Sequence, residues 1–573
     1  MSPRSSLPDV GRRLPRPTRR RVVGIIAVAL AGALALSACS SAGTSTSSAS
    51  SSSSSSSGSS KADITVAVPA LAPSLDGVVG GGCLTLECFE MNANLQAGLV
   101  RNPYVAGTTK GTVVQDFNKY VPYVAKSWDV SSDGLTYTFH LRPGLKSQVG
   151  NVITADDVKW SFERKWNSPL YAKSSWASFA GPDAITVIDK DTAAFKLTSA
   201  GFGQTFLGLL ANLQGHIYDS TLLKQHATAD DPYALNWAKS NSGWGLGPYE
   251  VSSQTPDQQM VLTANKNWAL GTPKTKQITL RVVADAGTRA SLVNTGAVDM
   301  AEGITPNDQA KLANSAAVTV PSVANPIEYA DLTLVTNKAP FDNEKVRQAM
   351  AYATPYGQII SQIYQKRAVK MVGNINPSTK NYSTKGLPTY SYDPKKAKAL
   401  LAAAGFPNGV SFTLSVSTAT SDLIDAAVLV KSYAADAGFN ITIDQETATA
   451  FSQTRSVASG QAIIYRNRAQ VQTPTYATTT FFKPNNDPSN PSRWQDADNT
   501  TFQSTIAAAQ AQKDPLSVEA GKEWEKAEST LLTSTPEIFI ASIQPSQVYA
   551  KDVTGYTYRS ENAIDFSNIS VGG

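Results

Sequence analysis

Residues 410–443 read VSFTLSVSTATSDLIDAAVLVKSYAADAGFNITI, and this stretch decides the fold class. Residues 410–416 alternate as a β-strand does, residues 422–437 carry apolar side chains at helical spacing, and residues 441–443 form a second short strand. Strand, helix and strand at this spacing make a βαβ unit, which places both strands parallel in a sheet covered by helices. The sequence therefore predicts an α/β protein with mixed sheets flanked by helices.

Local signals elsewhere predict further elements of the same kind. A strand is expected at 64–68, and a hairpin joins 128–130 to 135–142 through a Ser-Ser-Asp-Gly turn. His140 falls on the polar face of that hairpin, so we expect an exposed strand residue rather than a catalytic one. Capping residues and prolines predict helices that begin at residue 155, span 285–294, 344–353 and 395–404, and restart after Pro355.

The first 38 residues have the composition of an export signal. They contain seven arginines against Asp9 alone, and residues 22–36 are apolar. A basic start, an apolar run of about 15 residues and a small-residue cleavage site form a secretory signal, and the run is too short to predict a membrane-spanning helix. Residues 18–23, TRRRVV, also partly fit a twin-arginine signal, so the Sec and twin-arginine export routes both stay open.

The signal ends in LSAC at 36–39, which resembles the bacterial lipobox, and the resemblance implies that Cys39 is lipidated. The alternative is an ordinary cleaved signal with an incidental cysteine. Residues 40–60 contain 15 serines among 21 positions, a composition that forms a flexible coil rather than a core. We therefore expect residues 39–61 to tether a folded body to the outer face of the cell membrane.

The net charge of the 573-residue chain, +5, comes from its leader. Without residues 1–38 the 50 basic and 45 acidic residues become 43 and 44, a net charge of −1. This balance gives no electrostatic case for a nucleic-acid partner. The length predicts two or three domains, because single cores stop growing at about 250–300 residues.

The cysteines agree with export. With Cys39 assigned to lipid, Cys83 and Cys88 remain, and a close pair in an oxidising compartment favours a disulfide that closes a tight loop. A metal site is the sharper alternative, but the three histidines have no helical ligand spacing. We expect neither a metal nor another cofactor.

Six stretches, in order, resemble the extracellular solute-binding family 5, which serves peptide-type ABC importers. The stretches are VAKSW at 124–128 with DGLTYTFHLR at 133–142, TADDV at 154–158 with SFE at 161–163, GLGPY at 245–249, GAVD at 296–299, VRQAMAYA at 346–353, and DPKKAKALL at 393–401 with AGF at 404–406. Each one is a cap, turn or core face that occurs in many folds. Six in the order of the family identify the scaffold and say little about the ligand.

The resemblance implies a periplasmic-binding-protein-like clamp of two lobes that closes over a solute and delivers it to ABC permease subunits served by a separate ATPase. It implies a monomer that is not an enzyme, and the chain has neither a Walker-type nor a Gly-x-Ser-x-Gly motif. The expected divisions are lobe I at 62–325 with an inserted subdomain at about 105–240, lobe II at 326–540, and a return to lobe I at 541–573.

Family members that take peptides commonly anchor the ligand ammonium with an aspartate in a W-x-x-D-x-x-D-P stretch. The corresponding stretch here is residues 465–474, YRNRAQVQTP, in which Gln470 stands near the aspartate position. A buried ammonium without a carboxylate would cost several kcal/mol. We expect an oligopeptide ligand, with two alternatives: a non-peptide solute such as an oligosaccharide or anionic conjugate, or a surface receptor that does not import.

Arg466 and Arg468 alternate on an expected strand and would form a clamp for a carboxylate or another anion. A salt bridge within the protein, or a solvated strand edge, is the alternative for both. Aromatic and polar residues complete the set of candidate ligand contacts: Tyr465, Asn467, Gln470, Trp244, Trp494, Glu87 and Phe89. Core or hinge packing is the alternative for the two tryptophans.

Overall fold

The computed structural model describes residues 63–76, 85–168, 181–484, 490–512 and 514–572. The predicted signal, the Ser-rich tether, Cys39 and Cys83 lie outside these residues. Residues 58–573 form one compact unit, distinct from residues 1–57. Within the described ranges, no helix combines the length and the apolar character needed to cross a membrane.

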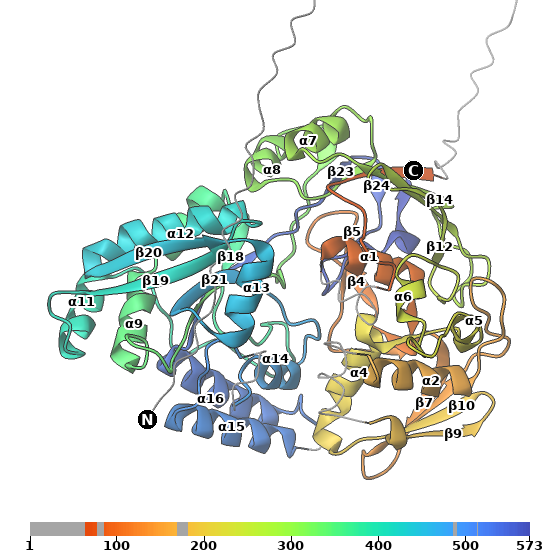
Figure 1. Cartoon of the computed structure of the whole chain (residues 1–573), viewed down its shortest axis with the longest axis horizontal. Coiled ribbons are helices and arrows are strands. Elements are labelled where there is room, and N and C mark those ends of the chain that lie inside the picture. Colours follow the sequence, from red (N-terminus) through yellow and green to blue (C-terminus); the bar gives the residue numbers. More distant parts are fainter. Residues whose placement is uncertain (1–62, 77–84, 169–180, 485–489, 513, 573) are drawn as a thin grey trace, which may run out of the picture. The chain divides into compact units, whose positions relative to one another are not determined.

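A six-stranded sheet contains the βαβ unit that the sequence predicts (Figure 1). Its strands, in spatial order, are β18 (Ala368–Lys370), β22 (Glu537–Ile543), β17 (Tyr329–Leu334), β21 (Ala462–Asn467), β19 (Val410–Ser417) and β20 (Phe439–Glu446). β19 and β20 are parallel and begin in register at Val410 and Phe439. Between them runs α12 (Ser421–Ala434), which buries Leu423, Ala426 and Val430.

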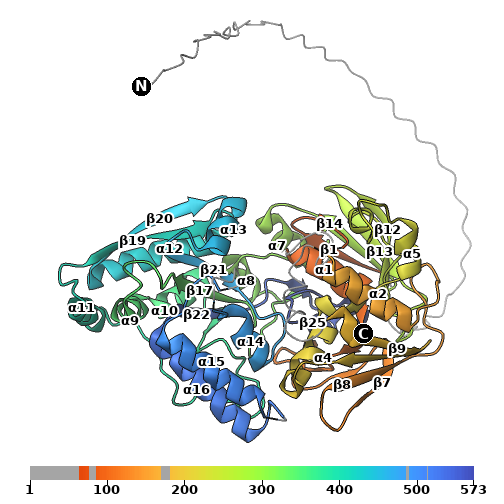
Figure 2. The same cartoon turned by 60° about the horizontal axis from the view of Figure 1, so that its bottom comes forward.

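Further helices belong to the same half of the chain. Their bounds are α9 (Glu344–Ala353), α10 (Tyr356–Gln358), α11 (Pro394–Ala403), α13 (Ala448–Val457), α14 (Pro474–Phe481), α15 (Ala497–Gln510) and α16 (Val518–Ser534). α15 and α16 lie side by side in both views (Figure 2). Together with α12, helix α9 encloses an apolar core on one face of the six-stranded sheet.

A seven-stranded sheet joins the start of the body to its C-terminal part. In spatial order it contains β12 (Tyr249–Thr255), β13 (Gln259–Ala264), β14 (Gln277–Val282), β1 (Asp63–Val68), β15 (Met300–Ala301), β23 (Val548–Ala550) and β16 (Val318–Thr319). β1 is parallel to β14 and to β15. Three helices come after strands of this sheet along the chain. They are α1 (Leu86–Leu95) after β1, α7 (Ala286–Asn294) after β14 and α8 (Pro306–Leu312) after β15.

A four-stranded antiparallel sheet and several helices occupy the segment where the subdomain is expected. The strands, in spatial order, are β7 (Ala125–Val130), β8 (Thr136–Leu141), β10 (Thr192–Lys196) and β9 (Ile185–Asp189), and the helices are α2 (Ala155–Trp166), α4 (Gly203–Ala211), α5 (Ser220–Gln225) and α6 (Leu235–Ala238). The predicted hairpin is confirmed, because β7 pairs with β8. Tyr137, Phe139 and Leu141 of β8 are buried on one face. His140 lies on the opposite face, where its Nε2 is 2.9 Å from Asp129 Oδ2.

Short strands complete the chain around these sheets. They are β2 (Ala97–Gly98) with β11 (His216–Ile217), β3 (Val100–Arg101) with β6 (Val121–Pro122), β24 (Val553–Thr554) with β26 (Ser570–Val571), and a three-stranded group of β4 (Tyr104–Ala106), β5 (Thr112–Gln115) and β25 (Tyr556–Tyr558).

The predicted capping is confirmed at the helices. Thr154 and Asp157 form a reciprocal capping box on α2, and the Asp393 side chain accepts from the Lys396 N–H at the start of α11. The helix after Pro355 is shorter and less regular than expected, with a three-residue α10 followed by a π-helical turn, η4 (Ile359–Ile363). A proline can begin a helix without fixing the hydrogen-bond pattern of the turns after it.

The chain passes between the two large sheets at residues 320–328 and again at 544–547. β22 ends at Ile543 in the six-stranded sheet, and β23 begins at Val548 in the seven-stranded sheet. The expected boundary at residue 540 lies inside β22. The lobe and subdomain limits remain predictions.

Candidate functional site

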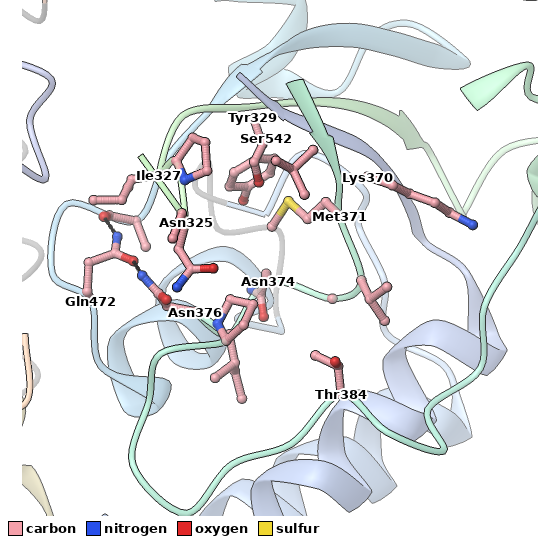
Figure 3. A pocket seen from close by; sticks show the side chains of 18 residues that line it. Asn325, Ile327, Tyr329, Lys370, Met371, Asn374, Asn376, Thr384, Gln472 and Ser542 are labelled. Carbon is pink, nitrogen blue, oxygen red and sulfur yellow. Dashed lines mark hydrogen bonds between the residues drawn. The ribbon is translucent and has the colours of Figure 1, made fainter. Parts of the chain in front are cut away.

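A pocket lies where the first of these crossings enters β17 (Figure 3). It offers about 640 Å³ of open space, including its mouth. Five parts of the chain supply the lining: residues 324–327 with Tyr329, residues 369–377 at the end of β18 and beyond it, Thr384, Ala469 with Gln472 after β21, and Ser542 of β22. The strand order β18-β22-β17-β21 brings these segments to one place.

The pocket lining is mainly apolar, contains several neutral polar side chains and carries little charge. Asn325, Asn374, Asn376, Thr384 and Gln472 present amide and hydroxyl groups, as Figure 3 shows, and apolar residues separate them. Lys370 is the charged residue of the lining, but its Nζ donates to the Tyr390 carbonyl. This surface suits a ligand with uncharged hydrogen-bonding groups, such as amides.

Hydrogen bonds hold two of the amide side chains in fixed orientations. Asn376 Nδ2 donates to Gln472 Oε1 at 2.8 Å, and Gln472 Nε2 donates to the Ala469 carbonyl. Asn376 Oδ1 accepts from the Ser378 N–H at 2.9 Å.

A second pocket of about 600 Å³ adjoins the first, because Ala324, Asn325 and Asn376 line both. A solute longer than the first pocket could therefore extend into the second, whose lining is mainly apolar.

The two candidate arginines lie close together and contact carboxylates. Arg466 Nη2 is 2.7 Å from Asp422 Oδ2, and its Nη1 is 3.3 Å from Glu328 Oε2. Burial opposes the charge of Arg466, but the carboxylates of Glu328 and Asp422 outweigh it and hold the pKa above its ordinary value. The Arg468 guanidinium lies 3.5 Å from Glu328 Oε1 and 4.5 Å from the centroid of the Phe89 ring. The structure thus brings Arg466, Arg468 and Phe89 to one network around Glu328, and the anion clamp remains a prediction.

Gln470 bonds to a distant segment of the chain. Its Oε1 accepts from Gln214 Nε2 at 2.8 Å, and its carbonyl accepts from Asn212 Nδ2 at 2.8 Å. Asn212 and Gln214 lie between α4 and β11, so these bonds join that segment to the one after β21. At the position where the family resemblance implies an acidic anchor, this chain therefore carries an amide that already has partners.

Tyr465 and Asn467 share one face of β21. Asn467 Nδ2 donates to the Tyr465 hydroxyl at 3.1 Å, and Tyr465 stands opposite Asp331 of β17. Burial, with Asp331 and Glu537 nearby, raises the pKa of the Tyr465 hydroxyl well above its ordinary value. Both residues therefore face buried carboxyl groups and not solvent.

The two tryptophan candidates lie at separate places. Trp244 packs edge-on against Tyr218 with ring centroids 5.2 Å apart, and Trp494 packs against Phe482 and Phe502. Both tryptophans are fully buried, and the described lining of the pocket includes neither. Glu87 and Phe89 lie on α1, beside Cys88, which is disulfide-bonded; its expected partner, Cys83, lies outside the described residues.

Comparison with known proteins decides the family. A family model described as bacterial extracellular solute-binding proteins, family 5 Middle, matches residues 119–489. The chain belongs to this family. The predicted membership is confirmed, and the relatives of this family 5 protein are substrate-binding proteins rather than enzymes.

Named relatives cover different shares of the family 5 protein. Glutathione-binding protein GsiB of Pectobacterium atrosepticum is 28% identical over 511 residues, which is 86% of this chain and 92% of that protein. Heme-binding protein A of Haemophilus influenzae is 32% identical over 304 residues, which is 50% of this chain and 54% of that protein. The second match therefore spans about half the length of each protein.

Solved structures share the fold of the family 5 protein. The periplasmic binding protein DppA of Helicobacter pylori, in complex with peptide STSA, has a TM-score of 0.74 at 23% identity, over 89% of this chain and 98% of its own. NikA of Brucella suis, in complex with Fe(III)-EDTA, has a TM-score of 0.75 at 17% identity, over 89% and 99%. These likenesses confirm the predicted two-lobe α/β clamp.

Sequence reasoning missed most of the pocket of this family 5 protein. Asn325, Tyr329 and Asn374 belong to no recognised sequence motif. They lie close together because of the strand order β18-β22-β17-β21. The one available signal was position, since Asn325 ends the predicted lobe I and Gln472 lies in the stretch compared with the family anchor. Among the described residues, no group of three or more His, Cys, Asp or Glu side chains could hold a metal ion.

Proposed function

We propose that this protein is the extracytoplasmic substrate-binding component of an ABC importer and captures oligopeptides between its two lobes. The observation that carries this proposal is the pocket lining, in which neutral amides such as Asn325, Asn376 and Gln472 alternate with apolar side chains. Amide side chains match the donors and acceptors of a peptide backbone, and apolar walls accept its side chains.

The names of two relatives also favour a peptide ligand. One is named for binding glutathione, itself a peptide, and the DppA structure is a complex with a four-residue peptide. The adjoining second pocket gives room for more than one ligand residue. We further propose that the protein works as a monomer, held to the outer face of the membrane through a lipid on Cys39, and delivers its ligand to permease subunits served by a separate ATPase.

A thermal-shift comparison tests the peptide assignment. A mixture of short peptides should raise the melting temperature, because a ligand that binds only the native state stabilises it by RT ln(1 + [L]/Kd). Oligosaccharides and anionic conjugates serve as the parallel arms. A shift with either of these, and none with peptides, would contradict the assignment.

A non-peptide solute is the second candidate, and Gln470 favours it. This side chain is neutral and already bonded to Gln214, so it supplies no carboxylate to a ligand ammonium. Mass spectrometry of the solute that co-purifies with the protein separates the two candidates, because a peptide gives sequence-specific fragment ions and a sugar conjugate does not.

The membrane anchor has its own test. Cys39→Ser removes the thiol that would carry the lipid, so the protein should move from the membrane fraction to the medium. The double variant Cys83→Ser and Cys88→Ser serves as the control, because it removes thiols from the body and keeps Cys39. Retention of the Cys39→Ser protein on the membrane would contradict lipidation at that residue.

A further inference from the structure

Two side chains on the pocket wall present buried oxygens without partners. Tyr329 is 3% exposed and Asn374 is 5% exposed, yet the Tyr329 hydroxyl and Asn374 Oδ1 have no hydrogen-bond partner among the described residues. Both residues line the pocket, as Figure 3 shows. Asn374 is held in place because its Nδ2 donates to the Ala477 carbonyl at 2.9 Å. A buried polar atom left unpaired destabilises the folded state, so these two oxygens call for an explanation.

Three buried carboxyl groups, which we call the acidic cluster, lie behind that wall: Asp331, Glu528 and Glu537. Their exposed fractions are 0%, 0% and 2%. Glu528 touches the wall directly, because its Oε2 accepts from the Asn374 N–H at 3.0 Å. A Cβ built at Gly373 would lie 1.6 Å from the same oxygen, so glycine is what allows the carboxyl group to approach this closely.

Tyr329 connects the acidic cluster to the pocket. It lies two residues before Asp331 on β17, on the same face of the strand, and it pairs across to β22, the strand of Glu537. Burial first, then the carboxylates of Glu537 and Asp331, raise the pKa of the Tyr329 hydroxyl well above its ordinary value. The hydroxyl therefore lies within the field of the acidic cluster while its ring borders the pocket.

The protein supplies little positive charge to the acidic cluster, so burial favours the protonated, neutral form of its carboxyl groups. Burial raises the pKa of Glu528 and of Glu537 to about 8, although the Asn374 N–H opposes the rise at Glu528 and the Thr333 hydroxyl opposes it at Glu537. Arg455, whose guanidinium lies 5.4 Å from the centroid of the Tyr465 ring, lowers the pKa of Asp331, but burial and Glu537 outweigh it.

The unpartnered atoms at this place are all oxygens. Among the described residues they are the Tyr329 hydroxyl, Asn374 Oδ1, Asp331 Oδ2 and Glu528 Oε1, and the Glu537 carboxyl group has the Thr333 hydroxyl beside it. Asn374 Oδ1 can only accept, whereas the Tyr329 hydroxyl and the protonated carboxyl groups can also donate; a cation at this wall would favour the ionised carboxylates, which accept only. A guanidinium offers five N–H donors and an ammonium offers three, and a carboxylate accepts either in a charge-assisted bond.

We propose that the pocket takes a cationic group of its solute, a guanidinium or an ammonium, at the wall of Tyr329 and Asn374 and against the acidic cluster. This inference rests on the proposed function and narrows it to peptides with a basic side chain or a free amino terminus. The attraction of the acidic cluster would then replace the anchor that Gln470 does not provide.

Matched pairs of ligands test the proposal by isothermal calorimetry on the whole protein. The pairs are N-acetylated tetrapeptides with arginine or citrulline at one position, and with lysine or norleucine at that position. Citrulline and norleucine keep the shape and remove the charge. We expect each cationic peptide to bind at least tenfold more tightly than its neutral partner.

Variants then locate the preference. Glu537→Gln and Tyr329→Phe should each reduce the arginine-to-citrulline ratio to less than threefold, because each weakens binding of the arginine peptide more than binding of the citrulline peptide. The matched control is Glu523→Gln on α16, the helix of Glu528, because Glu523 pairs with Lys526 in the same helix at 3.8 Å. It should keep the wild-type ratio. If Glu537→Gln does not fold, Asp331→Asn is the second variant for the same measurement.

N-acetylarginine amide and N-acetylcitrulline amide separate failure of this proposal from failure of the peptide assignment, because acetylation removes the α-ammonium and leaves the guanidinium as the difference in charge. If no peptide binds but N-acetylarginine amide alone raises the melting temperature, the cationic site stands and the peptide function is wrong. If peptides bind and charge makes no difference, the cationic site is wrong and the peptide function stands. Equal responses to both amides, or no response to any cationic ligand, also overturn the cationic site.

Discussion

Gln544 and Val323 bind each other across the two crossings between the large sheets. The Val323 N–H donates to Gln544 Oε1 at 2.8 Å, and Gln544 Nε2 donates to the Val323 carbonyl at 2.9 Å. Val323 lies between β16 and β17, and Gln544 lies between β22 and β23. The side-chain amide of Gln544 therefore bonds to both the N–H and the carbonyl of Val323. It joins the two crossing segments, at which a two-lobe clamp would need to bend.

We expect Gln544→Ala to lower the free energy of unfolding by about 1–3 kcal/mol, because it leaves both backbone groups of Val323 without their partner. Urea unfolding measures this change. The control is Gln258→Ala, since Gln258 is exposed on the β12–β13 turn and its loss should change stability by less than about 0.5 kcal/mol. Equal losses in both variants would show that the crossing segments do not depend on Gln544.

The contact between Gln214 and Gln470 should favour the form in which their two segments meet. Gln470→Ala should weaken ligand binding by about 3- to 10-fold, the loss of one neutral hydrogen bond. Gln214→Ala should do the same, and the double variant should be little worse than either single variant because the two share one interaction. Calorimetry on the four proteins measures the coupling, and full additivity of the two losses would contradict it.

Arg466 should contribute more to stability than Arg468 does. Its guanidinium pairs with Glu328 and Asp422, so Arg466→Ala leaves the largely buried Asp422 without this cation and leaves Glu328 with the longer contact to Arg468. We expect a loss of about 1–3 kcal/mol in the free energy of unfolding. Arg468→Ala should change stability less, because its contact with Glu328 is 3.5 Å long. If ligand affinity falls in either variant while stability stays at the wild-type value, the predicted anion clamp is supported instead.

Stability should fall as the pH rises from about 5 to about 8. Glu528 and Glu537 keep their protons in the folded protein up to a pKa of about 8, but lose them near the ordinary value of 4.5 when unfolded. In this window the folded state binds more protons than the unfolded state. The free energy of unfolding therefore falls as the pH rises, by at most about 1.4 kcal/mol per pH unit for each group.

Urea unfolding at pH 5.5, 6.5, 7.5 and 8.5 measures this slope. Glu528→Gln removes one titrating group and should flatten the dependence, whereas Glu523→Gln should leave it as in the wild type. A stability that rises with pH across the window would mean that the acidic cluster is ionised in the folded protein without ligand.

The sequence predicted the scaffold well because its signals are local. Alternation along β19, the Thr154 capping box on α2 and Asp393 at the start of α11 each act within a few residues, so a reading along the chain finds them. The pocket was not predictable in this way. Asn325, Asn374 and Gln472 meet because β22 and β17 lie between β18 and β21, and that order is set by packing across the whole sheet.

The acidic cluster was missed for a related reason. Glu528 reads as an ordinary acidic residue of a long helix, and its burial shows only when α16 is placed against the segment after β18. The stretch at 465–474 was identified by comparison with the family. The structure connects it to the pocket through Gln472 and Ala469, and to the acidic cluster through Tyr465 and Asn467.

The placement of β22 and β23 affects how the chain can be made. β22 fills an interior position between β18 and β17, and β23 fills one between β15 and β16. Neither large sheet is continuous until residues 537–550 are available. A nascent chain that stops short of them holds two interrupted sheets with unpaired strand edges, a state prone to aggregation. Neither half can therefore complete its large sheet before residues 537–550 have been synthesised.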